Sequence, residues 1–209
     1  SDTINLPPLE ELDGLLLFFI TRRNTVMPII SKLSPEKTAA AFMLGESVES
    51  SAGDPTKAGQ SVRVVGTNPF IVGDEAAEGN WIFEFIKRHK DKVHGYLLNT
   101  GGVGEIRERL ADGTTRVKRE VTRIQIPETS CIFRAIVRNQ INWTEDPYFN
   151  NLVPDAVDGT DMKKFDPAGV YSKEELETQV NELKEERREY LRKFPGLDSE
   201  IVNAVKESK

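Results

Sequence analysis

An unbroken apolar run at positions 15–20 constrains the fold of this chain more than any other feature of its sequence. The run is bounded by Gly14 and Thr21 and contains Phe18 and Phe19. Its length and aromatic content predict a β-strand that is buried on both faces, because a half-buried strand would alternate apolar and polar residues. The run is far shorter than the roughly 20 residues that a membrane span needs.

Other strands are expected further along the chain. A strand pattern at residues 93–98 leads directly into a turn that holds three glycines. Shorter patterns lie at residues 62–65 and 121–126. Asp112-Gly113, between flanks of alternating charge, is typical of a hairpin turn.

The sequence also marks where helices begin. Ser34, followed by proline and glutamate, predicts a helix that runs to about residue 50 and whose alanines pack closely against another element. A helix is predicted over residues 78–90, and a further one begins at Pro127 and runs to about residue 139. In the helix over 78–90, four side chains at helical spacing are expected in the core: Trp81, Ile82, Phe85 and Ile86.

The C-terminal part has the clearest helix signals. Ser172 and Glu175 form a capping-box pattern that opens a long helix through about residue 193. A short helix is expected from Ser199. Strands and helices together predict an α/β class fold, with a single domain over residues 14–209 after a polar lead-in or linker at residues 1–13.

Charge and cysteine content argue against several classes of protein. The net charge of −6 weakens any case for nucleic-acid binding, which usually needs a basic face. A single cysteine, Cys131, excludes an internal disulfide and suits a reducing compartment. It lies in an apolar stretch, so a buried and inert thiol is expected. With no secretory leader pattern and no membrane span expected, we predict a cytoplasmic protein.

A basic stretch at residues 107–123 is the one local exception in charge. It contains six cationic side chains with acidic ones between them and no aromatic side chain for stacking on bases. The favoured interpretation is a solvated hairpin. The alternative is an edge that faces an anion.

The glycine turn after residue 98 suggests a phosphate-binding loop but lacks the required pattern. A P-loop needs a lysine and a hydroxyl residue after its last glycine, and the chain contains no such sequence. The dinucleotide pattern is only half met by Gly102 and Gly104, and charged residues follow them where a small, apolar helix start is needed. On pattern alone, nucleotide contact at this turn stays open.

No other complete active site is visible in the sequence. Cys131 lacks a histidine partner, because His89 and His94 both lie in a charged, surface-type stretch. The two histidines have no third metal ligand nearby. Three carboxylates lack the glycine turn and distal glutamate of a calcium loop, so a solvated acidic loop is expected: Asp155, Asp158 and Asp161. We therefore assign no catalytic residue and no metal ligand.

Several stretches, taken in order, resemble the C-terminal part of ATP-type phosphoenolpyruvate carboxykinases. The turn sequence YLLNTG at residues 96–101 is close to that family's YLVNTGW, and RIQIPET at residues 123–129 is similar to its R-I-S-I-x-x-T run. The similarity covers nearly the whole chain. The other matching stretches are residues 15–33, 34–45, 51–53, 67–70 and 165–171.

The resemblance implies a mixed sheet with flanking helices, as in part of the family's C-terminal nucleotide-binding domain. It implies ATP as a cofactor, with Arg123 and Ile124 flanking the adenine and Thr129 nearby. A guanidinium can stack on a purine, and an aliphatic side chain can cover the other face of the ring. Asn99 and Gly101 would turn the backbone tightly beside the nucleotide.

The resemblance also implies what this chain lacks. The family converts oxaloacetate and ATP to phosphoenolpyruvate, ADP and CO2 with magnesium and manganese, a step of gluconeogenesis. Its P-loop, metal ligands and substrate-binding arginines all precede the matching segment. The chain is therefore expected to be inactive alone and to have the upstream catalytic half of the enzyme as its partner. The alternative is a non-catalytic module that senses a nucleotide or binds a subunit.

Three positions depart from the family's pattern within these stretches. Gly102 replaces the tryptophan after the glycine turn, Gln125 replaces a serine, and Ser130 replaces an arginine. The basic stretch at residues 107–119 resembles an insertion. These differences bear on the adenine contacts and on the choice between ATP, GTP and pyrophosphate.

Overall fold

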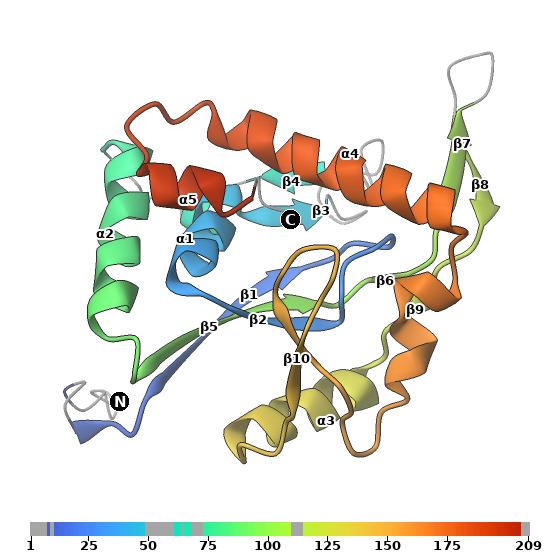
Figure 1. Cartoon of the computed structure of the whole chain (residues 1–209), viewed down its shortest axis with the longest axis horizontal. Helices are drawn as coiled ribbons and strands as arrows, with labels where there is room; N and C mark the ends of the chain where they lie inside the picture. Colours follow the sequence, from blue (N-terminus) through green and yellow to red (C-terminus); the bar gives the residue numbers. More distant parts are fainter. Residues whose placement is uncertain are drawn as a thin grey trace, which may run out of the picture.

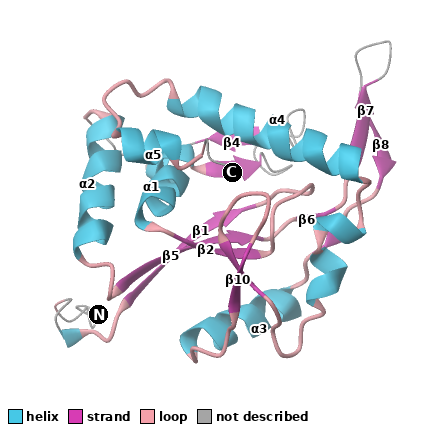
Figure 2. Cartoon of the chain, in the orientation of Figure 1, coloured by secondary structure: helices cyan, strands magenta, loops and turns pink. Residues whose placement is uncertain are grey.

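The computed structural model describes residue 8 and residues 11–48, 61–63, 65–67, 73–109 and 115–205. These residues form an α/β fold in which helices lie on both sides of a five-stranded mixed sheet (Figures 1 and 2). The predicted α/β class, with a mixed sheet and flanking helices, is confirmed. Most of the expected lead-in lies outside the described residues.

The sheet has the strand order β1-β5-β2-β11-β10. β1 (Leu15–Thr21) pairs in parallel with β5 (Val93–Asn99), and β5 pairs antiparallel with β2 (Ile30–Leu33). β11 (Leu152–Pro154) and β10 (Trp143–Glu145) continue the sheet with antiparallel pairs. β5 is thus an interior strand, whereas β1 lies at one edge of the described sheet.

β1 differs from its prediction in burial. The strand itself is confirmed, but its apolar side chains are only half-buried, and Ile20 is 60% exposed. β5, the interior neighbour, is buried at six of its seven positions. The expectation that the run at residues 15–20 would be buried on both faces is therefore wrong for this structure, because β1 has a neighbouring strand on one side only.

α1 (Pro35–Leu44) packs on one face of the sheet and against α2 (Glu75–Arg88). The close packing expected of its alanines is confirmed, since Ala39 and Ala40 are buried. A Cβ on Gly95 of β5 would lie 2.2 Å from Oγ1 of Thr38, and a Cβ on Gly79 of α2 would lie 2.4 Å from Sδ of Met43. Glycine at these two positions leaves room for the Thr38 and Met43 side chains against the neighbouring backbone.

α1 ends at Leu44, earlier than predicted. Gly45 adopts the left-handed conformation, with φ 46° and ψ 43°, and its N–H donates to the carbonyl of Ala41. Such a glycine is a common helix end. The chain then forms β3 (Glu46–Val48), which pairs with β4 (Ser61–Arg63), and the 3₁₀ turn η2 (Val65–Thr67) follows.

α2 begins three residues before its predicted start, because Asp74 caps it by accepting a hydrogen bond from the N–H of Ala76. Phe83 and Ile86 are buried, but Trp81 is 64% exposed and stacks on Phe85 along the outer surface. The prediction that Trp81 belongs to the core is wrong. The buried stripe of α2 runs through Phe83 instead.

α3 (Ile126–Val137) covers the opposite face of the sheet (Figure 1). Phe133 of α3 contacts Phe18 of β1, whose ring stacks on Tyr96 of β5. Cys131 on the same helix is only half-buried and accepts a hydrogen bond from Nη2 of Arg134 at 3.3 Å. The thiol is therefore less buried than predicted.

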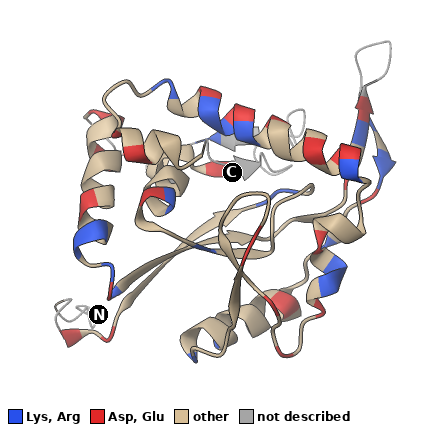
Figure 3. Ribbon diagram, in the orientation of Figure 1, with Lys and Arg blue, Asp and Glu red and all other residues tan. Residues whose placement is uncertain are grey.

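α4 (Lys173–Leu191) is the long helix predicted from the capping box. The Ser172 hydroxyl accepts from the N–H of Glu175, and the Glu175 carboxylate accepts from the N–H of Ser172. Cationic and anionic side chains are interspersed along the helix (Figure 3). The 3₁₀ turns η3 (Met162–Phe165) and η4 (Pro167–Gly169) precede it, and α5 (Ser199–Asn203) follows it.

The basic stretch forms an antiparallel hairpin of β7 (Ile106–Arg109) and β8 (Thr115–Arg119). The predicted turn at Asp112-Gly113 lies outside the described residues. Arg107 and Arg116 form ion pairs with acidic neighbours on the hairpin or just before it, as expected of a solvated hairpin. Within the described ranges, no helix combines the length and apolar composition that crossing a membrane requires.

Candidate functional site

The two parallel strands end side by side, and the loops that follow them pack together. Thr21 of β1 is in register with Asn99 of β5. The N–H of Gly102 donates to the carbonyl of Arg23 at 2.8 Å, and the N–H of Gly104 donates to that of Thr25 at 3.1 Å. Ligands of α/β proteins bind at the carboxyl ends of such strands, so this edge is the place to look for a site.

Asn99 holds the two loops together. Its side chain is fully buried, and Oδ1 accepts from the N–H groups of Arg23 and Gly101 at 2.9 and 3.0 Å. Nδ2 donates to the carbonyls of Met27 and Gly102 at 3.2 and 3.3 Å. Because all these bonds are internal, the geometry gives Asn99 a backbone-positioning role. Direct contact between Asn99 and a ligand stays a prediction.

Gly101 is required by a close backbone approach. A Cβ at this position would lie 2.2 Å from the Arg23 carbonyl oxygen and 2.9 Å from Oδ1 of Asn24. Real Cβ contacts are not this short, so any larger residue would force the two loops apart. Gly101 therefore lets the chain pass close to the loop that follows β1.

The glycine turn also pairs with the segment that carries the predicted adenine contacts. β6 (Gly102–Val103) pairs antiparallel with β9 (Thr122–Arg123), and Gly102 is directly opposite Arg123. The N–H of Ile124 donates to the Gly101 carbonyl at 3.0 Å. Four of the five predicted site residues are thus gathered at one edge of the sheet: Asn99, Gly101, Arg123 and Ile124.

The side chains of these residues differ in exposure. The side chain of Arg123 is exposed, and it makes no hydrogen bond or ion pair with the described residues. Ile124 is buried in the core, whereas Ile126, at the start of α3, is 83% exposed. Thr129, the fifth predicted residue, is half-buried, and its hydroxyl donates to the carbonyl of Gln125 at 3.3 Å. The exposed isoleucine of this stretch is therefore Ile126, which the sequence did not single out.

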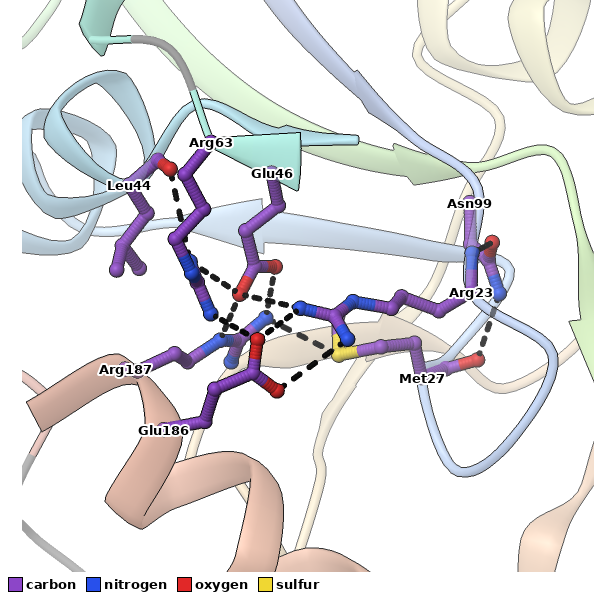
Figure 4. Close-up of polar contacts among 8 residues, drawn as sticks. All are labelled: Arg23, Met27, Leu44, Glu46, Arg63, Asn99, Glu186 and Arg187. Carbon is purple, nitrogen blue, oxygen red and sulfur yellow. Dashed lines mark hydrogen bonds and ion pairs between the residues drawn. The ribbon is translucent and has the colours of Figure 1, made fainter. Parts of the chain in front are cut away.

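A cluster of five charged side chains lies beside these loops and was missed in the sequence (Figure 4). Its members come from the loop after β1, from β3, from β4 and from α4. We call it the arginine–glutamate cluster: Arg23, Glu46, Arg63, Glu186 and Arg187. No local pattern could have revealed it, because residues that touch, such as Glu46 and Arg187, are 141 positions apart.

Glu46 is the centre of the arginine–glutamate cluster. Arg187 donates to its two oxygens from Nε at 2.8 Å and from Nη2 at 2.7 Å. Nη1 of Arg63 donates at 3.1 Å, and Nη2 of Arg23 lies 3.6 Å away. Paired hydrogen bonds between arginine and carboxylate are among the strongest in proteins.

Burial alone would raise the pKa of Glu46, but the charge and hydrogen bonds of Arg187, with the charges of Arg23 and Arg63, lower it to about 2. The same pairing raises the pKa of Arg187 against the opposing effect of its burial. The pKa of Glu186 is also lowered, because attraction to Arg23 and Arg63 outweighs its desolvation. Both carboxyl groups are thus ionised at neutral pH.

The cluster and the glycine turn are connected through Arg23. Its guanidinium donates to the two oxygens of Glu186 at 3.0 and 3.3 Å. Its backbone carbonyl accepts from Gly102, and its N–H donates to Asn99. The cluster therefore holds the loop after β1 in place, and that loop in turn supports the glycine turn.

We expect the stability of the chain to fall as the pH is lowered from about 5 to about 2. A carboxyl group whose pKa is lower in the folded state than in the unfolded chain stabilises the fold above its unfolded pKa, which is near 4.5 for Glu46. That contribution, about 3 kcal/mol, is lost as the pH falls through the folded pKa of about 2. Urea unfolding at pH 7 and pH 2 measures it. The variant E46Q should lose most of this pH dependence; an equally steep dependence would contradict the assignment.

A cavity of about 320 Å³ borders the cluster at Glu46 and Arg187. Apolar side chains of β1, α1 and β5 form one wall, and Lys184, Arg187 and Glu46 contribute charge. None of the five predicted site residues is among its described lining residues. The cavity and the glycine turn are therefore separate features.

The acidic positions expected in a solvated loop are exposed: Asp155, Asp158 and Asp161. Among the described residues, no group of three or more histidine, cysteine or acidic side chains is arranged so that it could hold a metal ion.

Comparison with known proteins gives a consistent result. The family model for phosphoenolpyruvate carboxykinase, of the ATP type, matches residues 13–163. The chain is 26% identical over 185 residues to the phosphoenolpyruvate carboxykinase (ATP) of Aeropyrum pernix. The aligned region covers 87% of this chain and 33% of that protein. It is 29% identical over 190 residues to the phosphoenolpyruvate carboxykinase (ATP) of Rhodopseudomonas palustris strain BisA53, in an alignment that covers 88% of this chain and 33% of that protein. The chain thus spans about a third of the length of the curated relatives that it matches.

Proposed function

We propose, because this chain belongs to the phosphoenolpyruvate carboxykinase family, that it forms the C-terminal, nucleotide-binding part of an ATP-dependent enzyme of that family. The complete enzyme would convert oxaloacetate and ATP to phosphoenolpyruvate, ADP and CO2 in the cytoplasm. One observation supports the position of the nucleotide: Gly102 pairs with Arg123 at the carboxyl end of β5, which leaves an exposed guanidinium beside a tight glycine turn.

In this proposal the adenine ring lies against Arg123. A guanidinium stacks on aromatic rings and stays charged at every physiological pH. The exposed side chain of Ile126 would provide apolar surface in the same stretch, whereas Ile124 would support the backbone from the core. Thr129 offers a hydroxyl group in the second turn of α3. Asn99 and Gly101 act indirectly, by holding the backbone of the turn.

The chain alone is proposed to be inactive. Phosphoryl transfer depends on a lysine and metal ions that neutralise the phosphates, and this sequence has no P-loop lysine. The described residues offer no site that fits magnesium or manganese. Both metals, and the groups that contact oxaloacetate, would come from the upstream part of the enzyme, which is the partner of this chain. Among the described residues, no contact favours the alternative of a non-catalytic sensing module.

Substitution of Arg123 tests the nucleotide site. In the complete enzyme, Arg123→Ala should weaken ATP binding about tenfold, since a stacked cation contributes roughly 0.5–2 kcal/mol. The unfolding midpoint should not change, because the side chain is exposed and makes no contact that holds the described fold. Calorimetric titration with ATP and with GTP measures both affinities.

Arg138→Ala is the matched control, since Arg138 is also exposed but lies at the other end of α3. It should leave ATP affinity unchanged. Equal ATP affinity in Arg123→Ala and the unmodified enzyme would mean that Arg123 is an ordinary surface residue and that the nucleotide lies elsewhere.

A further inference from the structure

We propose that the cavity of about 320 Å³ between the sheet, α1 and α4 is a binding site for a medium-chain aliphatic monocarboxylate. The inference goes beyond the proposed nucleotide function, because none of the five predicted nucleotide residues is among the described residues that line this cavity. The lining combines an apolar floor with a group of cationic side chains. These two parts match the tail and the head group of such a ligand.

The floor of the cavity is apolar. Phe19 of β1 and Leu97 of β5 are direct neighbours in the parallel pair, so their side chains lie on the same face of the sheet. Ala40, Ala41 and Leu44 line the cavity from α1. The two alanines fill little space, which leaves room between this helix and the sheet. Apolar cavities are poorly hydrated and take up apolar molecules, so the floor suits an aliphatic chain.

The volume of the cavity sets the size of the ligand. Pockets that bind small molecules typically measure about 300–1,000 Å³, and this cavity of about 320 Å³ is at the lower end of that range. At about 30 Å³ for each water-sized group, it has room for about ten non-hydrogen atoms. Octanoate contains that number and serves as the probe below.

The charged part of the lining is mainly cationic. It includes Lys37 of α1, Lys184 and Arg187 of α4, and one carboxylate, Glu46. Arg187 donates to the two oxygens of Glu46 at 2.7 and 2.8 Å, so these two charges match one another. The excess of cationic charge in the described lining therefore comes from the two lysines.

The three cations gather around one residue, Phe149. Nζ of Lys184 and Cζ of Arg187 lie 5.7 and 5.5 Å from the centroid of its ring. Nζ of Lys37 donates to the carbonyl of Phe149 at 3.0 Å. This carbonyl holds the ammonium group in place but carries no charge. The cationic charge is thus concentrated at one place in the cavity wall, where a single head group can reach it.

The charges near the two lysines favour a ligand with one negative charge. Asp146 is a buried carboxylate that interacts electrostatically with both Lys37 and Lys184. One carboxylate beside two ammonium groups leaves one positive charge in excess. Burial also lowers the pKa of Lys184, and a bound carboxylate would offset this desolvation by stabilising the charged form.

The same distribution of charge argues against other classes of ligand. The second carboxylate of a dicarboxylate would lie against the apolar floor, and an unpaired charge is strongly disfavoured there. The proposed ligand is therefore not the oxaloacetate of the carboxykinase reaction. A cationic amphiphile would be repelled by the two lysines, and a neutral alcohol would fill the floor without meeting their charge.

Calorimetric titration of octanoate into the complete enzyme, saturated with ATP, tests the site. One octanoate should bind per chain, with a dissociation constant on the order of 10–100 µM. Octan-1-ol has the same chain without the charge and should bind at least about tenfold more weakly. Absence of octanoate binding would mean that another part of the polypeptide fills the cavity, and it would overturn the proposal. Equal affinities for the two probes would do the same.

Two variants separate the head-group contact from the floor. Lys184→Met keeps an apolar stem and should weaken octanoate binding about tenfold or more, while octan-1-ol binding stays unchanged. Ala41→Leu should weaken both probes about tenfold or more, because the larger side chain occupies the cavity. Thermal unfolding establishes that each variant is folded, and the Lys184→Met comparison does not depend on how Ala41→Leu folds.

Lys173→Met is the matched control, since Lys173 is on the same helix but its side chain is 93% exposed and does not line the cavity. It should leave octanoate affinity unchanged. An equal loss in Lys173→Met and Lys184→Met, or full octanoate affinity in Lys184→Met, would overturn the proposal. Arg123→Ala should also leave octanoate affinity unchanged. A loss there would place octanoate in the nucleotide site and contradict a separate cavity site.

Discussion

The variant E46Q is expected to unfold about 3–5 kcal/mol more easily than the unmodified chain. Glu46 is buried, and its charge is matched by the bidentate contact with Arg187 and by Arg63. Removing that charge leaves the buried guanidinium of Arg187 without its main partner, and breaking a buried pair in this way costs about 3–5 kcal/mol. Urea denaturation at pH 7, followed by circular dichroism, measures the change.

Two further variants make this result specific. Glu186 neighbours Arg187 in sequence and also pairs with Arg23 and Arg63, but its side chain is 38% exposed, so Glu186→Gln should cost much less. The double variant Glu46→Gln, Arg187→Met also removes the Arg187 guanidinium, which E46Q alone leaves unpaired. The double variant should therefore be more stable than E46Q. A cost of E46Q below about 1 kcal/mol would show that the arginines find other partners.

Gly101→Ala is expected to destabilise the chain by about 3 kcal/mol and to weaken ATP binding in the complete enzyme. The new Cβ would lie 2.2 Å from the Arg23 carbonyl oxygen, which already accepts a hydrogen bond from Gly102. Since the oxygen is a backbone atom and a Cβ is bonded directly to the backbone, neither can move aside as a flexible side chain would, and the overpacking must be relieved by separating the loops. Thermal unfolding and ATP titration measure the two effects.

Gly73→Ala is the matched control for this substitution. A Cβ at Gly73 would meet no atom within 4 Å, so stability should change little. If Gly101→Ala proved as harmless as Gly73→Ala, the glycine turn would not be held against the loop after β1. If Gly101→Ala lost stability but kept full ATP affinity in the complete enzyme, the turn would be structural only.

Helix ends were predicted well where the responsible contacts are local. The capping box at Ser172 and Glu175 forms both of its hydrogen bonds, and Pro35 stands in the first turn of α1. These signals depend on residues at most three positions apart. The end of α1 was placed too late, because a left-handed glycine at residue 45 stops the helix although apolar and small residues continue around it.

Part of the candidate site was also accessible from the sequence. The resemblance at residues 96–101 and 123–129 indicated two separate stretches, and the pairing of Gly102 with Arg123 brings them together. The sequence did not indicate that Ile124 would be buried and Ile126 exposed. Which face of a short segment turns inward depends on how it pairs with its neighbour, and β9 is only two residues long.

The arginine–glutamate cluster could not have been predicted. Arginine and glutamate are common on solvated helix faces, and the charged sequence of residues 184–188 is typical of such a face. Burial of Arg187 requires that α4 lie against β3, and this contact joins Glu46 to a residue 141 positions later. The exposure of Trp81 has a similar origin, since helical spacing identifies an apolar stripe but not which part of it meets α1.

For this chain, patterns over a few neighbouring residues were enough to establish its α/β class, its main helices and strands, and the glycine turn, because caps, turns and apolar periodicity act over short range. The partners of Glu46, the burial of Ile124 and the open edge of β1 arise from the packing of distant segments. Packing energies depend on which surfaces meet, and no local pattern encodes that. The apolar run at residues 15–20 shows both effects. Its composition is that of an interior strand and predicts the strand itself, whereas the packing of the described sheet places it at an edge.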